Sequence, residues 1–202
     1  GAVFKRLFFI ISDSTFYEIV FYSMSRIMAG FLLALICGIL LAVLTSQWSF
    51  AYQLFAPIMG VIKATPVASF IILALIWLKA GGAVTFSVFL MVVPMVWSNL
   101  YQGIQNTDPQ LLEMGRDFRF SRYKMVRWIY IPAVLPYFIS TISTGLGFAW
   151  KAGVAAEVLG TPKHSIGQSL SNAKIYLETA DLFAWTLIVI ILSILLEKMV
   201  LR

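Results

Sequence analysis

The sequence predicts an all-α protein that crosses a membrane several times, and two observations carry this prediction. Of its 202 residues, 60% are apolar and 12% are charged, whereas soluble domains carry about 25% charged residues. Membrane lipid cannot satisfy backbone N–H and C=O groups, so spans are helices or closed barrels. Barrel strands alternate apolar and polar residues, and the long apolar runs of this chain do not. Helices are therefore favoured.

Residues 1–25 are expected to form an amphipathic segment on the outer membrane surface. Apolar residues recur there at helical spacing, with Lys5, Arg6 and Glu18 among those between them, as in interfacial helices. Asp13 is a candidate cap for a second helical stretch within the segment. The segment shows no signal-peptide pattern, and we expect the natural protein to continue upstream with a sixth membrane helix.

Residues 26–200 are expected to form a transmembrane domain with five spans, because a span needs about 20 apolar residues. The predicted spans are residues 27–44, 54–78, 83–105, 128–150 and 182–196. The second contains Lys63, Pro57 and Pro66; a proline removes a backbone hydrogen bond, and such a break survives in a membrane only under cover of protein or water. Lys63 and Pro66 therefore belong to a pathway or packing contact, or else a shorter span begins near Val67 with Lys63 at the interface.

The loop of residues 107–127 determines the predicted orientation. Five Lys and Arg residues lie between positions 116 and 127, and loops rich in these residues stay in the cytoplasm. We therefore place this loop and the C-terminus on the cytoplasmic side, and residues 1–25 outside. The turn at residues 45–53 should also be cytoplasmic, although it has no Lys or Arg. Since the net charge of +6 reflects this topology, no nucleic-acid partner is expected.

The same loop alternates its basic residues with large apolar ones such as Met114 and Phe118. An amphipathic helix docked in a partner's groove would have this pattern, and so would a helix lying on lipid headgroups. Both interpretations remain open from the residues alone.

No catalytic or metal site is expected. The chain has one cysteine, Cys37, and one histidine, His164, which is too few for a zinc site or a Cys–His pair. It also lacks the GxxxxGK[ST] sequence of nucleotide-binding loops. We therefore expect no cofactor, and we do not expect an enzyme.

At the loop, the sequence resembles the permease subunits of ABC importers. Their signature is Glu-Ala-Ala, three residues, Gly, nine residues, and then Ile-x-Leu-Pro. Glu113, Ile129 and Pro132 match it at the correct spacing. Met114 and Gly115 stand at the two alanine positions, so the match is partial there.

Two further positions depart from this signature. Ile131 replaces the leucine, which is a conservative change, but Arg119 occupies the glycine position. Glycine permits a sharp turn that arginine would adopt only at an energetic cost. The resemblance nevertheless covers about residues 20–197. LGFAWKAGVAAEVLG, followed by GQSLSNA, is similar to the nitrate, sulfonate and taurine branch of these type I permeases.

The resemblance implies a bacterial inner-membrane subunit that forms a translocation pathway with a second copy, expected to be a homodimer. It implies an ATP-binding cassette subunit and an extracytoplasmic solute-binding protein as further partners, and a small anion such as a sulfonate, nitrate or taurine as solute. The loop would fit into a cleft of the ATP-binding subunit. The residues assigned to this coupling are Glu113, Met114, Gly115, Phe118, Arg119, Ile129 and Pro132.

The candidate pathway residues are Lys63, Pro66, Lys151 and Glu157, because charges inside a bilayer are costly and often mark a pathway. Lys151 and Glu157 lie six positions apart, about 240° around a helix, so they could pair only if Gly153 broke the helix. Lys151 either helps an anion to pass or marks the outer interface. Glu157 shapes a gate, holds a neighbouring subunit or makes a structural pair.

Two other classes of membrane protein fit the spans. A channel or scaffold subunit outside the ABC importers would have similar helices, but it would not co-purify with an ATP-binding subunit. An ion-coupled secondary transporter usually carries several intramembrane acidic or histidine residues, and here only Glu157 qualifies.

Overall fold

The computed structural model describes residues 2–200, and every regular element in that range is a helix. This confirms the predicted all-α class. The elements in chain order are α1 (Ala2–Ser12), α2 (Ser14–Gln47), α3 (Ser49–Ala64), α4 (Val67–Trp77), α5 (Ala80–Gln105), α6 (Pro109–Asp117), α7 (Arg122–Met125), the π-helical turn η1 (Val126–Tyr130), α8 (Ile131–Gly160), α9 (Ile166–Ile175) and α10 (Thr179–Val200).

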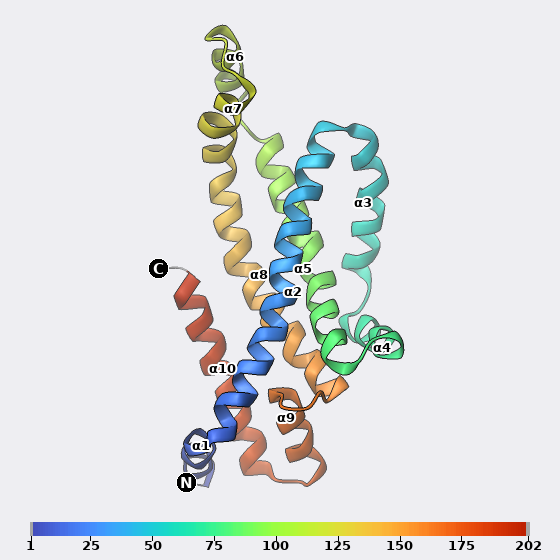
Figure 1. The fold of residues 1–202 in the computed structure, drawn as a ribbon, viewed down its shortest axis with the longest axis vertical. Helices are drawn as coiled ribbons and strands as arrows, with labels where there is room; N and C mark the ends of the chain where they lie inside the picture. The colour runs from blue at the N-terminus through green and yellow to red at the C-terminus, as the bar shows by residue number, and fades with distance from the viewer. Residues whose placement is uncertain (1, 201–202) are drawn as a thin grey trace.

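Three long helices, α2, α5 and α8, run side by side through the molecule (Figure 1). Helices α1 and α9 lie at one end, called here the α9 end. Helices α6 and α7 protrude at the opposite end, called here the loop end. The turn between α2 and α3 also lies towards the loop end, which agrees with the relative topology that the sequence predicts.

The number of spans agrees with the sequence as well. Among the described residues, four helical stretches are long and apolar enough to cross a membrane: α2, α5, residues 122–160 and α10. Helices α3 and α4 would form a fifth span, bent by 101° at the break between them. The break falls at Thr65 and Pro66, as the proline predicts, because proline cannot donate to the preceding turn.

Small residues bring the central helices together. Helix α5 presents a row of fully buried valines at four-residue spacing, of which Val88 and Val96 face glycines of α2. A Cβ added to Gly38 would lie 2.6 Å from the Cβ of Val96. On the other side, Gly153 of α8 leaves room for Ile27, whose side chain a Cβ there would overlap. Such contacts drive helix association in membranes, where hydrophobic exclusion is absent.

Residues 2–25 belong to two helices that meet at Asp13. Helix α1 ends at Ser12, and residues 14–25 are the first turns of the 34-residue helix α2. Asp13 caps α2 as predicted, because its carboxylate accepts a hydrogen bond from the Thr15 N–H at 3.1 Å. This bond holds the pKa of Asp13 below its ordinary value. An ion pair between Arg6 and Asp181 ties α1 to α10.

The predicted fourth span is too short. Helix α8 continues past position 150 and through Gly153 to Gly160. Lys151 does not end it, because its side chain lies on the exposed face of the helix. Glu157 does not end it either, because it finds polar partners on α2 and α9. Since α8 stays helical at Gly153, the two charged residues do not pair.

Candidate functional site

The protrusion at the loop end is a helical hairpin whose helix starts are specified locally. The side chain of Asp108 accepts a hydrogen bond from the Gln110 N–H at 2.8 Å, and Pro109 occupies the first helical position of α6. Proline suits that position, since its missing N–H would have no partner there. Ser121 caps α7 through the Lys124 N–H at 3.4 Å.

Arg119 makes the sharp turn between these helices, with φ at 49°. The Arg119 N–H donates to the Arg116 carbonyl at 2.9 Å, and the Phe120 N–H donates to the Gly115 carbonyl at 2.8 Å. This is the Schellman pattern, which normally places glycine in the left-handed position. The residue that departs most from the signature therefore adopts the conformation that the glycine would.

We expect Arg119→Gly to stabilise the protein by about 1 kcal/mol, because the left-handed conformation crowds a Cβ against the following carbonyl. The matched control is Arg116→Gly, which lies inside α6 and should destabilise the protein by about 1 kcal/mol. Denaturation of the purified full-length protein in detergent measures both changes. Destabilisation by both variants would contradict the assigned turn.

Gly115, near the start of the signature, packs against Ile129, near its end. Gly115 is buried, and a Cβ there would lie 2.8 Å from Ile129 Cδ1 and 2.9 Å from Met125 Sδ. Helix α6 thus rests directly on η1, and Ile129 is 4% exposed beneath it. The contact fixes the hairpin to the beginning of α8.

The π-helical turn η1 connects the hairpin to the long helix without interruption. The Ile131 N–H donates to the Val126 carbonyl, five residues back. Pro132 follows as the second residue of α8, inside this continuous helical stretch, so its missing N–H removes one hydrogen bond to the preceding turn. Wider turns of this kind often occur at functional sites.

The outer side of the hairpin exposes large apolar side chains. Met114 is 43% exposed, Phe118 72% and Tyr123 76%. Glu113 and Arg119 are exposed beside them, and these five residues are called here the hairpin surface. Within residues 2–200, none of the five basic residues at positions 116–127 makes an ion pair. The hairpin surface therefore combines exposed apolar side chains with Glu113 and Arg119, and further basic residues lie next to it.

The candidate pathway residues lie in different parts of the structure. Lys63, on α3, lines a hollow of about 140 Å³ with Pro94 of α5 and Phe148 of α8. Lys151 is exposed one turn beyond Phe148 on α8. Pro66 lies at the break between α3 and α4. Glu157 is remote from this group and fully buried.

Glu157 belongs to a polar junction at the α9 end that joins α2, α8 and α9. Its Oε2 accepts hydrogen bonds from Ser23 Oγ at 2.8 Å and from the Gly167 N–H at 3.2 Å. Its Oε1 faces Arg26 Nη1 at 3.6 Å, and neither atom has a hydrogen-bond partner among the described residues. Glu157 thus makes a pair within the chain, which is one of the alternatives for this residue.

The junction also satisfies the first N–H groups of α9, which are buried and have no hydrogen-bond partner within the helix. The Ile166 N–H donates to Ser23 Oγ at 2.9 Å, and the Gln168 N–H donates to Ser165 Oγ at 3.0 Å. A Cβ on Gly167 would overlap the backbone of Glu157, so α9 approaches α8 closely only because this residue is glycine.

Sequence reasoning missed Ser23, Arg26 and Gly167 as partners of Glu157. Ser23 lies 134 positions away in the sequence, and no local spacing joins them. The one available signal was Arg26, a charge that directly borders the first apolar run and needs a partner as much as Glu157 does.

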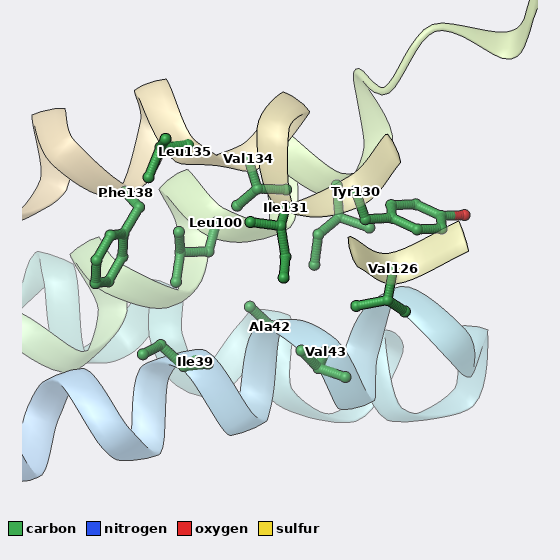
Figure 2. Close-up of a pocket in the computed structure, with 11 residues that line it drawn as sticks. Ile39, Ala42, Val43, Leu100, Val126, Tyr130, Ile131, Val134, Leu135 and Phe138 are labelled. Atoms are coloured by element: carbon green, nitrogen blue, oxygen red, sulfur yellow. The ribbon is translucent and has the colours of Figure 1, made fainter. Parts of the chain in front are cut away.

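A groove opens between α2, α5 and α8 near the loop end (Figure 2). Its volume is about 400 Å³, and Leu100 of α5 forms part of its floor. Ile39 and Val43 of α2 line one wall, and Val134 and Phe138 of α8 line the other. No pattern in the sequence indicates this groove.

Comparisons with known proteins agree with this architecture. The family model described as "Binding-protein-dependent transport system inner membrane component" matches residues 19–200. The chain is 29% identical over 141 residues to a nitrate import permease protein of Synechocystis sp., covering 69% of this chain and 51% of that protein. It is 22% identical over 186 residues to the taurine transport system permease protein of Escherichia coli K12, covering 92% and 67%. The chain thus spans about half the length of the nitrate relatives that it matches.

Two solved structures share the fold. One is the MetNI methionine ABC transporter in an inward-facing conformation, with a TM-score of 0.78, 12% identity and coverage of 92% of this chain and 93% of that one. The other is an amino acid ABC transporter with histidines, with a TM-score of 0.76, 14% identity and coverage of 92% and 90%. At these identities the likeness concerns the fold.

Proposed function

Since this chain belongs to the family of binding-protein-dependent transport system inner membrane components, we propose that it forms the translocation pathway of an ATP-driven importer. The sequence contains no GxxxxGK[ST] motif, so ATP hydrolysis is assigned to a separate ATP-binding subunit. An external solute-binding protein delivers the solute, and a second copy of the chain completes the pathway.

The hairpin surface carries this proposal. Energy can pass between two subunits only through contacts that differ between two states. Exposed apolar residues such as Met114 and Phe118 supply anchors for a partner's groove, and their basic neighbours supply a charged rim. The cytoplasmic placement of residues 107–127 follows from their positive charge, and places the surface where an ATP-binding subunit is accessible.

The contact between Gly115 and Ile129 gives the hairpin a mechanical connection to the membrane helices. Because α7, η1 and α8 are continuous from Arg122 to Gly160, a displacement of the hairpin moves the start of α8. We assign to this unit the conversion of ATP-driven closure into a change between inward- and outward-open helices.

For the solute we propose a small anion. The relatives are named as permeases for nitrate and taurine, and Lys63 and Lys151 supply positive charge on the exposed side where Phe148 faces α3. Calorimetric titration of the cognate solute-binding protein with nitrate, taurine and an alkanesulfonate tests this. Binding of only solutes that have no anionic group would exclude it.

We expect Met114→Arg to weaken association with the ATP-binding subunit by about tenfold, because it places an extra unpaired cation in an apolar contact. Transport-linked ATP hydrolysis should fall in parallel. Binding of the variant to the immobilised ATP-binding subunit measures the affinity. ATP hydrolysis is measured in reconstituted vesicles.

The control for this variant is Tyr176→Arg, an equally drastic change at an exposed position of the α9 end. It should leave association with the ATP-binding subunit unchanged. If the unmodified protein never co-purifies with an ATP-binding subunit, the alternative of a channel or scaffold subunit is favoured instead.

A further inference from the structure

The groove of Figure 2 exists because α2 and α8 diverge towards the loop end. Near the α9 end, Gly145 and Gly153 allow α8 to contact Phe31 and Ile27 of α2 closely. From Phe138 back to the start of α8 the chain has no glycine. Larger side chains therefore hold the two helices apart, and the space between them is about 400 Å³.

The groove continues into a second hollow at the loop end. This hollow measures about 580 Å³ and shares Val43, Val126 and Tyr130 with the groove. Its remaining lining differs in character, because it includes Gln47 and Arg122. The two adjoining spaces, together called here the channel, are apolar in the groove and polar and cationic at the mouth.

Arg122 at the mouth has no ion-pair partner within residues 2–200. A guanidinium group recognises phosphate through paired, charge-assisted hydrogen bonds. The walls belong to helices that are long and apolar enough to cross a membrane, so lipid acyl chains are available to the groove. An anionic headgroup complements the charge of Arg122 at this mouth.

We propose that this channel binds one anionic glycerophospholipid from the leaflet at the loop end. An acyl chain lies in the apolar groove between α2 and α8, and the phosphate contacts Arg122. The apolar part gives no preference over bulk lipid, whose tails are equally apolar. Selectivity for the lipid class therefore comes from the mouth. Because binding is measured without transport, the inference can be tested independently of the proposed function.

The test is native mass spectrometry of the full-length protein in detergent, titrated with phosphatidylglycerol or with phosphatidylcholine of the same acyl chains. One basic residue near an anionic headgroup contributes about 1 kcal/mol, which corresponds to about fivefold in affinity. We expect the protein to prefer phosphatidylglycerol by about this factor, and Arg122→Gln to bind both lipids equally.

Two variants examine the apolar part. Val134→Trp and Ile39→Phe fill the groove from opposite walls and should reduce the binding of both lipids. Leu40→Trp is their control, because Leu40 is 64% exposed and does not line the groove. Arg127→Gln is the control for the charge, because Arg127 lies over the Trp128 ring and does not line the mouth.

Three results would overturn the proposal. The unmodified protein binds both lipids equally, Arg127→Gln removes the preference as fully as Arg122→Gln does, or a photo-crosslinking residue at position 134 labels a second copy of the chain instead of lipid.

Discussion

Glu157→Ala is expected to destabilise the full-length protein by about 3–5 kcal/mol, because it removes a fully buried carboxylate from the partly exposed Arg26 and from two hydrogen-bond donors. The substitution leaves Arg26 Nη1 without the carboxylate that it faces at 3.6 Å. It also leaves the Gly167 N–H without an acceptor and takes from Ser23 Oγ the oxygen to which it donates. Unfolding in mixed micelles by a denaturing detergent measures the loss.

The coupling between the two charges can be separated from the loss of packing. Arg26→Met removes the cation and retains much of the side-chain volume. In the double variant Arg26→Met with Glu157→Ala, we expect less destabilisation than the sum of the two single changes, because no buried charge is left unpaired. Glu178→Ala is the control, since Glu178 is an exposed carboxylate near the same end. Strict additivity would show that the pair contributes nothing.

This junction has a consequence for the transporter as a whole. It joins the beginning of α2, the end of α8 and the beginning of α9, all at the end opposite the hairpin. A movement that enters α8 at the hairpin therefore meets a fixed contact after about 30 residues of helix. We infer that Glu157 makes α8 and α9 move as one unit with the first part of α2.

Much of the fold could be predicted from the sequence because the bilayer permits so few structures. Unbroken apolar runs identified α2, α5 and α10, and Pro66 identified the break between α3 and α4. The turn at Arg119 could be located from the signature spacing alone. Each of these rests on residues that are adjacent or nearly adjacent in the chain.

The remaining features could not be predicted, because they depend on residues that meet only after folding. Lys151 and Glu157 both interrupt an apolar run, yet one is exposed and the other fully buried. Their difference arises from Ser23 and Arg26, which lie on another helix. The groove likewise depends on where the glycines of α8 end relative to α2, which no local pattern reveals.

The second large effect is expected at Gly115, where the size of the substituted residue should decide the outcome. In Gly115→Ala the atoms nearest to the new Cβ are Ile129 Cδ1 at 2.8 Å and the Sδ and Cε of Met125 at 2.9 and 3.1 Å. These atoms lie at the ends of flexible side chains and can move by a few tenths of an ångström. We therefore expect Gly115→Ala to retain nearly full transport-linked ATP hydrolysis.

Gly115→Leu should instead reduce transport-linked ATP hydrolysis by about 100-fold. A leucine cannot fit between α6 and η1, and a displacement of about 1 Å at a contact remote from the chemistry can cost this much. Overpacking should also destabilise the protein by about 1–3 kcal/mol, less than the loss predicted for Glu157→Ala. The two variants should therefore have opposite orders in the two measurements. Gly115→Leu should be the more stable variant, and it should retain less transport-linked ATP hydrolysis than Glu157→Ala. Assays in reconstituted vesicles measure ATP hydrolysis and transport, and unfolding in detergent measures stability. If hydrolysis followed stability across the two variants, the hairpin would have no specific part in coupling.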